Sequence, residues 1–349
     1  MSLPKTMKAI IKAKRAPGLT FIEDYPVPQI KPGEVLVKVM AGSICGTDLH
    51  IYNWDEWAQQ RLKPPLIVGH EITGEVVEVA SDVDSVKVGQ LCSLESHVVC
   101  NHCFYCRTGR EYICENTKII GVDRDGGFAD YIAIPSQNVW PNPTSTPLQI
   151  AVLEENLGNA IHAVMAQDVG GKFVLVTGCG PVGLMAITVA KAVGARAVFA
   201  TDISQYRLDL AHKMGADRVL DATKEDVVAI IHELTDHEGV DVLLEMSGAP
   251  SAIKQGFAAL KSGGAAALLG LVSAPFSFDV NENIILKGVI ARGIAGRRLW
   301  ETWYMARGLL EAGALTLDPL VTHRFAMADF KQAYETFQGG NSGKIMLIP

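Results

Sequence analysis

The fold of this chain is decided by the stretch Lys172-Phe173-Val174-Leu175-Val176-Thr177-Gly178-Cys179-Gly180-Pro181-Val182-Gly183. Its apolar first half predicts a short buried strand, and the apolar run Leu184–Val193 predicts a helix directly after it. Gly178, Gly180 and Gly183 fit the pattern Gly-x-Gly-x-x-Gly, which indicates a dinucleotide site when a strand precedes it and a helix follows. The first glycine allows a tight turn, the second admits a pyrophosphate close to the backbone, and the third lets helix and strand pack.

An acid follows the next predicted strand at the position expected for a ribose ligand. Asp202 comes directly after Ala197–Thr201 and nineteen residues after Gly183, where a carboxylate binds the ribose hydroxyls of NAD and repels the 2′-phosphate of NADP. The alternative is that Asp202 caps the helix predicted over 205–214. Arg207, one turn into that helix, is placed to reach the adenosine or to pair with Asp202, and it leaves NADP open.

Helices and strands continue to alternate beyond this point, which predicts an α/β domain with a doubly wound parallel sheet. The further helices are expected over 225–235 and 251–260, and the further strands over 218–220, 240–246, 265–271 and 288–294. The predicted coenzyme site comprises Gly178, Gly180, Val182, Gly183, Asp202, Arg207, Leu269, Gly270, Leu271, Ile294 and Ala295.

The first part of the chain has a different character. Short strands without a long helix are expected over 7–11, 20–22, 34–39 and 73–79, which indicates a β-barrel-like domain with functional residues on its loops. One helix is predicted over 148–165, and two amphipathic helices over 299–311 and 328–338. The final strand, 344–348, has no partner in the alternating run, so we expect it to return to the first domain.

A second functional stretch lies in this first part. Cys45, Thr47 and His50 stand close together, and His70-Glu71 follows after a short interval. A cysteine, a histidine and a carboxylate are usual ligands of a catalytic zinc that keeps one position open. The hydroxyl of Thr47 and the imidazole of His50 are suited to carrying a proton from a metal-bound oxygen to water. The alternative is a small buried cysteine beside polar turn residues.

Four cysteines form a separate cluster. Cys100, Cys103, Cys106 and Cys114 have the spacing Cys-x2-Cys-x2-Cys-x7-Cys, which can close a tetrahedron of thiolates around a structural zinc. An iron–sulfur cluster is the competitor, but the bacterial ferredoxin run has a shorter last gap followed by proline, and here Glu115 follows. Free thiols are the remaining alternative.

Composition excludes several classes of protein. The chain has 349 residues, enough for two domains, and 48% of them are hydrophobic and 20% charged. We find no run of eighteen apolar residues and no signal core near the N-terminus, so neither a membrane span nor export is expected. The net charge of −7 argues against a nucleic-acid partner. Cysteine clustering without an export signal favours metal binding in a reducing cytoplasm.

With these motifs in order, the chain resembles the medium-chain, zinc-dependent alcohol dehydrogenase superfamily along nearly its whole length. Within that superfamily it is similar to the threonine-oxidising branch. The stretches that carry this resemblance are 45–57, 157–162, 245–250, 296–297 and 300–304. One position departs from the family, where proline usually follows an acid, because here Glu155 is followed by Asn156.

The resemblance implies a GroES-like catalytic domain over 1–157, completed by about 297–349, and a Rossmann domain over 158–296. It implies NAD, two Zn²⁺ ions per subunit, a homotetramer and a place in the cytoplasm. The metal ligands are then Cys45, His70 and Glu71 for the catalytic zinc and the four clustered cysteines for the structural zinc.

The expected reaction is the oxidation of L-threonine to L-2-amino-3-oxobutanoate. Thr47 and His50 would relay the proton, Glu155 would bind the metal or act beside it, and Glu154 would be solvated. His97 is a polar candidate for substrate selection, with a loop histidine that has no ligand as its alternative. The acids near His50, Asp55 and Glu56, would favour an ammonium group.

Two other functions remain open. A polyol or 2,3-butanediol dehydrogenase uses similar ligands, so the ligand set does not separate it from a threonine enzyme. A zinc-braced NAD-binding protein without turnover would need the cysteine cluster and the glycine motif, but not Cys45, Thr47, His50, His70 and Glu71 together.

Overall fold

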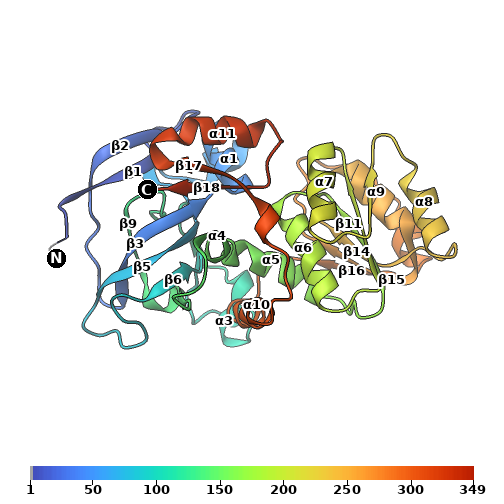
Figure 1. Cartoon of the computed structure of the whole chain (residues 1–349), viewed down its shortest axis with the longest axis horizontal. Helices are drawn as coiled ribbons and strands as arrows, with labels where there is room; N and C mark the ends of the chain where they lie inside the picture. The colour runs from blue at the N-terminus through green and yellow to red at the C-terminus, as the bar shows by residue number, and fades with distance from the viewer. Residues whose placement is uncertain (1–2) are drawn as a thin grey trace. The chain divides into compact units, whose positions relative to one another are not determined.

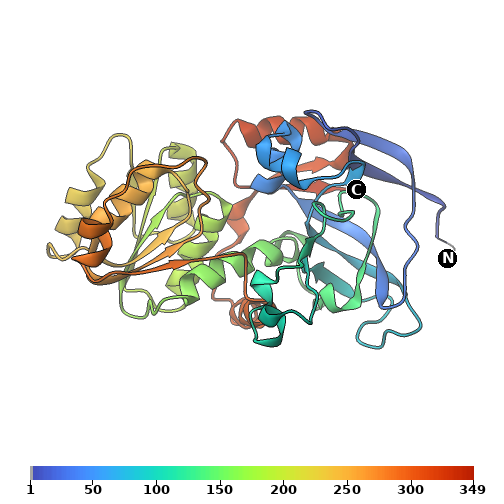
Figure 2. The ribbon, with the colours of Figure 1, turned by 180° about the vertical axis from the view of Figure 1, so that it is seen from behind.

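The computed structural model describes residues 3–349, which form two compact units. The first unit runs to Glu155 and resumes at Val321–Pro349, and the second is Asn156–Leu320 (Figures 1 and 2). Among the described residues, no helix combines the length and the apolar character needed to cross a membrane.

The chain returns to the first unit later than the family resemblance implies. The resemblance implies a return at about residue 297, but residues 297–320 belong to the second unit. The reason is packing: a Cβ on Gly158 would lie 2.6 Å from Cδ of Arg297 and 3.2 Å from Oγ1 of Thr302. A glycine at position 158 therefore lets this late segment pack closely within the second unit.

The first unit is built from antiparallel strands. A seven-stranded sheet has the order β10-β6-β5-β3-β18-β17, with β9 also paired to β3, and a three-stranded sheet has the order β2-β1-β4. The last strand, β18, pairs with β3 (Figure 1), as expected for a tail that returns to this unit. The strands are β1 (Thr6–Lys12), β2 (Thr20–Pro26), β3 (Glu34–Ser43), β4 (Leu66–Ile67), β5 (Glu71–Val79), β6 (Leu91–Leu94), β9 (Tyr131–Pro135), β10 (Val139–Pro141), β17 (Val321–Ala326) and β18 (Lys344–Ile348).

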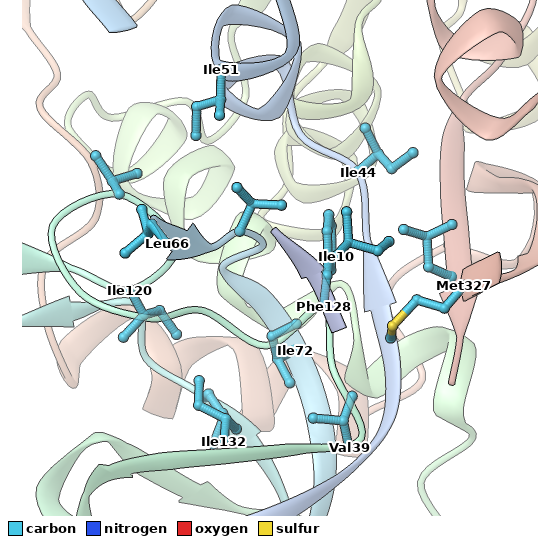
Figure 3. Packing of buried hydrophobic residues seen from close by; sticks show 14 of the residues in the cluster. Ile10, Val39, Ile44, Ile51, Leu66, Ile72, Ile120, Phe128, Ile132 and Met327 are labelled. Atoms are coloured by element: carbon cyan, nitrogen blue, oxygen red, sulfur yellow. The ribbon is translucent and has the colours of Figure 1, made fainter. Parts of the chain in front are cut away.

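One apolar cluster fills the first unit and brings distant segments together. Figure 3 shows Ile10, Ile51 and Phe128 pointing into this cluster from different segments. Phe128 is fully buried, and a Cβ on Gly69 would lie 2.3 Å from its ring, so only glycine fits there at the observed φ of +90°. The core thereby fixes the backbone immediately before His70.

The second unit has the predicted doubly wound form. Its six-stranded parallel sheet has the order β13-β12-β11-β14-β15-β16. Helices α6 and α7 cover one face, and α8 and α9 the other (Figures 1 and 2). The elements are β11 (Phe173–Thr177), α6 (Pro181–Ala192), β12 (Ala197–Asp202), α7 (Gln205–Lys213), β13 (Arg218–Asp221), α8 (Val227–Leu234), β14 (Val240–Glu245), α9 (Pro250–Ala259), β15 (Leu260–Leu268), β16 (Ile290–Gly293) and α10 (Glu301–Glu311).

The helix predicted over 148–165 is in fact two helices. The structure has α4 (Leu148–Ala151) and α5 (Glu154–Met165). The N–H of Leu153 donates to the carbonyl of Ile150, three residues back, so the first helix closes in a tight turn instead of continuing. The new helix therefore begins at Glu154 and Glu155.

Candidate active site and coenzyme site

The three predicted ligands of the catalytic metal meet in the first unit. One ligand atom from each of Cys45, His70 and Glu71 lies within 4.8 Å of the others. Cys45 is the N-cap of α1 (Gly46–Asn53), just after β3 ends. Ser43 at the end of β3 pairs with Glu71 at the start of β5, so the two segments leave the sheet side by side.

The charges around His70 favour a cation at this place. Burial alone would lower the pKa of His70, but the carboxylate of Asp48 and the thiol of Cys45 raise it to about 10. Oδ1 of Asp48 lies 3.7 Å from Nδ1 of His70, and both atoms are buried without a hydrogen-bond partner among the described residues. A carboxylate at the second ring nitrogen is the usual support of a metal-bound histidine. The donor set therefore fits a divalent cation.

The carboxylate of Glu71 also binds two residues that no sequence motif indicates. The ammonium of Lys344 donates to both carboxylate oxygens, and the hydroxyl of Ser43 donates to Oε2. Burial raises the pKa of Glu71, but the charges of Lys344 and His70 lower it overall. A metal at this site would share Glu71 with Lys344. The signal in the sequence was a lysine at the head of an apolar final strand.

The proposed relay residues lie on α1. Thr47 and His50 are three residues apart on this helix and therefore on one face. The side chain of His50 is 58% exposed, and its Nδ1 lies 2.5 Å from Oδ2 of Asp55. Asp55 also caps α2 (Glu56–Arg61) by accepting the N–H of Ala58 at 3.0 Å. The imidazole is thus oriented from one side and open to solvent.

Glu155 is near the metal ligands but is not one of the three. It is 4% exposed, its Oε1 accepts a hydrogen bond of 2.6 Å from Ser96, and its charge is one of those that raise the pKa of His70. The expectation that Glu154 is solvated was wrong, because Glu154 is only 5% exposed. The break before α5 turns both carboxylates inward.

His97 belongs to a local hydrogen-bond chain. It lies on β7 (His97–Val98), and its Nδ1 is 3.1 Å from Oε1 of Glu95, which also accepts the N–H of His97 at 2.8 Å. Ser96, between them in sequence, donates to Glu155. Glu95 is fully buried and was missed, because a single glutamate between strands carries no motif.

The four clustered cysteines are spaced for a single metal ion. Neighbouring Sγ atoms lie 3.5 Å (Cys103–Cys106), 3.6 Å (Cys100–Cys114), 3.8 Å (Cys103–Cys114) and 4.0 Å (Cys100–Cys106) apart. Four thiolates about 2.3 Å from a zinc in a tetrahedron have edges of about 3.8 Å. An iron–sulfur cluster would hold several iron atoms between the thiolates and spread them more widely. The donor set fits zinc.

The glycine motif opens α6 at the carboxyl edge of the parallel sheet. A Cβ on Gly183 would lie 1.9 Å from the carbonyl oxygen of Gly178, so the third glycine is required by close packing. A Cβ on Gly180, the N-cap of α6, would meet no atom within 4 Å. Space is therefore open at the helix N-terminus, where a phosphate binds best.

Asp202 braces this turn. Its Oδ2 accepts the N–H of Cys179 at 2.7 Å, and its Oδ1 accepts those of Ile203 at 2.8 Å and Ser204 at 2.9 Å. The carboxylate holds the residues before α7 and the glycine turn. It makes no ion pair with Arg207 in the described part of the chain, and the buried Nε of Arg207 has no hydrogen-bond partner.

The other predicted coenzyme residues follow the ends of β15 and β16. The N–H groups of Leu269 and Gly270 donate to the carbonyl of Glu245, at 2.9 and 3.2 Å. Leu271 is 92% exposed, whereas Ile294 is buried. Since β15 ends at Leu268, three predicted residues lie in the loop at the sheet edge rather than in a strand.

Comparisons with known proteins agree with this architecture. The family model described as "Zinc-binding dehydrogenase" matches residues 181–312, and "Alcohol dehydrogenase GroES-like domain" matches residues 31–144. A protein of Symbiobacterium thermophilum named L-threonine 3-dehydrogenase is 48% identical over 348 residues, which are 99% of each chain. A protein of the same name from Pyrococcus abyssi is 50% identical over 347 residues, again 99% of each chain.

Solved structures share the fold at lower identity. A dehydrogenase from Escherichia coli CFT073, complexed with NADH, has a TM-score of 0.91 and 27% identity, and the match covers 99% of this chain and 100% of the other. The 2R,3R-butanediol dehydrogenase of Bacillus subtilis has a TM-score of 0.88 and 28% identity over 99% and 100% of the two chains. The fold alone therefore does not separate substrates.

Proposed function

This chain belongs to the family of zinc-binding dehydrogenases that contains the L-threonine 3-dehydrogenases, and we propose that it oxidises L-threonine to L-2-amino-3-oxobutanoate with NAD. The observation that carries the proposal is the meeting of Cys45, His70 and Glu71 at the start of the helix that bears Thr47 and His50. The identity of about half over the full length of threonine enzymes favours this substrate over 2,3-butanediol, for which the related structure is 28% identical.

The chain's own residues supply the acid–base chemistry. Cys45, His70 and Glu71 would hold a zinc ion, whose chemistry would be to lower the pKa of a substrate hydroxyl. Thr47 accepts the proton of that hydroxyl while its own proton passes on toward His50. The carboxylate of Asp55, 2.5 Å from Nδ1, stabilises the protonated imidazole, and the exposed ring releases the proton to water. A bound NAD would accept the hydride of the carbinol carbon, and with it the two electrons that the substrate loses.

The second unit supplies the coenzyme site. The N-terminus of α6 would hold the pyrophosphate and Asp202 the adenosine ribose, which favours NAD over NADP. The carboxylate of Asp202 can still accept a hydrogen bond from a ribose hydroxyl. An ionised carboxylate offers about four lone pairs, and backbone N–H groups use three of them. The loops that begin at Leu269 and Ile294 would complete the site.

The lobe that carries Cys100, Cys103, Cys106 and Cys114, here called the cysteine lobe, would hold a second, structural zinc. Each subunit would then contain two zinc ions. All four positions of the lobe's tetrahedron are thiolates, so no place remains for a substrate. The gathering of four cysteines in one metal-ligating cluster supports a reducing compartment and hence the cytoplasm.

Assembly into a homotetramer is supported by the surface of the second unit. The edge strand β16 is exposed along its whole length, and an exposed edge tends to pair with another chain. Apolar side chains are exposed on and near it: Ile285 (63%), Leu286 (71%) and Ile290 (59%). Light scattering on the purified protein measures the assembly, and a monomer would contradict it.

The proposed reaction is tested by NADH formation from L-threonine, sorbitol and 2,3-butanediol under the same conditions. We expect kcat/KM to be highest for L-threonine, because buried polar groups that lack their partner reject a substrate without the ammonium. His97→Ala should reduce the difference in kcat/KM between L-threonine and the other two substrates, and the zinc content should stay unchanged. A higher kcat/KM for sorbitol or 2,3-butanediol would overturn the threonine assignment and leave the dehydrogenase.

A further inference from the structure

Lys12, at the end of β1, carries a buried ammonium group that has no carboxylate partner among residues 3–349. The side chain is fully buried. Its Nζ donates to the carbonyls of Ala16 at 2.7 Å, Gly18 at 3.1 Å and Ile51 at 2.6 Å. An ammonium has three protons, so these carbonyls satisfy all of them. Burial lowers the pKa of Lys12 to about 8.

An indole ring covers the same ammonium. The Nζ of Lys12 lies 4.8 Å from the ring centroid of Trp54, within the range of a cation–π interaction. Trp54 is the C-cap of α1 and has a left-handed backbone, with φ of 56°. The carbonyl of Ile51, in the last turn of α1, and the capping residue of that helix therefore both contact one cation.

The helix held in this way depends on its ends. With eight residues, α1 is too short to be stable alone. Carbonyls in the last turn of a helix lack the usual N–H partner four residues on. The carbonyl of Ile51 accepts the N–H of Trp54 at 3.3 Å and also Nζ of Lys12, and the carbonyl of Tyr52 accepts the N–H of Gly18, in the loop after β1, at 2.7 Å. A positive charge at a helix C-terminus is also favourable to the helix dipole.

Burial of Ile51 adds to this attachment. Its side chain points from α1 into the core of the first unit (Figure 3), so the residue is fixed by its side chain on one side and by Lys12 at its carbonyl. His50 is the preceding residue, and within residues 3–349 its ring is oriented by contacts to Asp55 and Trp57. A small rotation of the last turn would therefore move the imidazole.

We propose that Lys12 is a positioning residue for the proton relay: it binds the C-terminal end of α1 to the loop after β1 and so fixes His50 relative to Thr47. The proposal rests on the proposed function only in that His50 receives the proton. It does not depend on which alcohol is oxidised. Lys12 touches neither substrate nor coenzyme in this role.

The test compares Lys12→Met with Lys14→Met in the full-length enzyme. Lys14, two residues later in the loop after β1, is exposed and serves as the matched control. Hydrogen exchange of the α1 amides, measured by mass spectrometry without substrate, should rise severalfold in Lys12→Met and not in Lys14→Met. This readout stands even if the enzyme prefers another alcohol.

Turnover supplies the second readout. With the alcohol that wild type oxidises fastest, Lys12→Met should lower kcat about tenfold and leave KM for NAD within about twofold. Because a misplaced imidazole can be replaced by a base from solution, added imidazole should restore much of the loss, as it should for His50→Ala. Lys12→Arg, which keeps the charge but not the three-donor geometry, should fall between wild type and Lys12→Met, and it is the variant to use if Lys12→Met does not fold.

Unchanged exchange in α1, or a loss of kcat that imidazole restores in His50→Ala but not in a folded Lys12 variant, would overturn the proposal. Failure of wild type to oxidise L-threonine would instead count against the proposed substrate and leave the exchange result intact.

Discussion

Asp202 has two tasks at the residue scale, because it braces the glycine turn and would also bind the ribose. Asp202→Ser should lower the ratio of kcat/KM for NAD to that for NADP by at least roughly tenfold, since a hydrogen bond to a charged group contributes about 1.5–3 kcal/mol. Steady-state kinetics with both coenzymes measure the ratio. Asp209→Ser, on the exposed face of α7, is the control, and an unaltered ratio in Asp202→Ser would refute the role.

Substitution of the two neighbouring carboxylates of α5, Glu154 and Glu155, distinguishes a catalytic role from a packing role. Glu155 bonds to Ser96 beside the metal ligands, so Glu155→Ala should reduce kcat at least roughly tenfold, as loss of a residue that supports a metal site typically does. Glu154→Ala should affect kcat less. Turnover and metal content of the two variants decide this, and the reverse order of effects would show that Glu154 is the functional carboxylate.

Sequence motifs indicated both the metal site and the coenzyme site, but they did not indicate the residues that support these sites. Cys45, His70 and Glu71 stood out because a metal site needs those side chains. Asp48 and Lys344 did not, because each acts only through a neighbour that the fold brings to it: Nζ of Lys344 reaches Glu71 from the other end of the chain.

At the scale of an element, the cysteine lobe has little structure apart from its thiols. Between Cys100 and Cys114, all of which the structure describes, the helices are α3 (Phe104–Arg107) and a 3₁₀ turn over Glu111–Ile113. A metal ion would therefore be the main source of stability of this lobe. Cys103→Ser should lower Tm by at least about 4 °C, the shift expected for about 2 kcal/mol in a domain of this size. Calorimetry with parallel assays measures it. Loss of catalysis with unchanged Tm would contradict a structural role.

Element boundaries show where sequence patterns stop being informative. The spacing of apolar residues from Leu148 to Met165 predicts a single helix. The chain nevertheless turns at Val152 and Leu153, which are both buried. Buried residues on either side of a turn look the same in sequence as buried residues within a helix. Strands β11 and β12 were predicted well because their apolar runs end at glycine and aspartate.

At the scale of the whole molecule, the order of the two units was readable but the return point was not. Strand β18 was expected to pair in the first unit because the parallel sheet offered it no partner, and it pairs with β3. Residues 297–320 instead stay with the second unit, through contacts such as the N–H of Thr316 to Oγ1 of Thr188, at 2.8 Å. No local pattern encodes a contact between residues so far apart.

The central claim is that the meeting of Cys45, His70 and Glu71 is a catalytic zinc site. It is tested most directly by measuring zinc per subunit together with NADH formation and NAD binding in wild type and Cys45→Ser. Two zinc ions are expected in wild type and one in Cys45→Ser, whose turnover should fall below about 1% while NAD affinity stays within about twofold, because only the open metal site loses a ligand. Full turnover in Cys45→Ser, or one zinc ion per subunit in an active wild-type enzyme, would contradict the account.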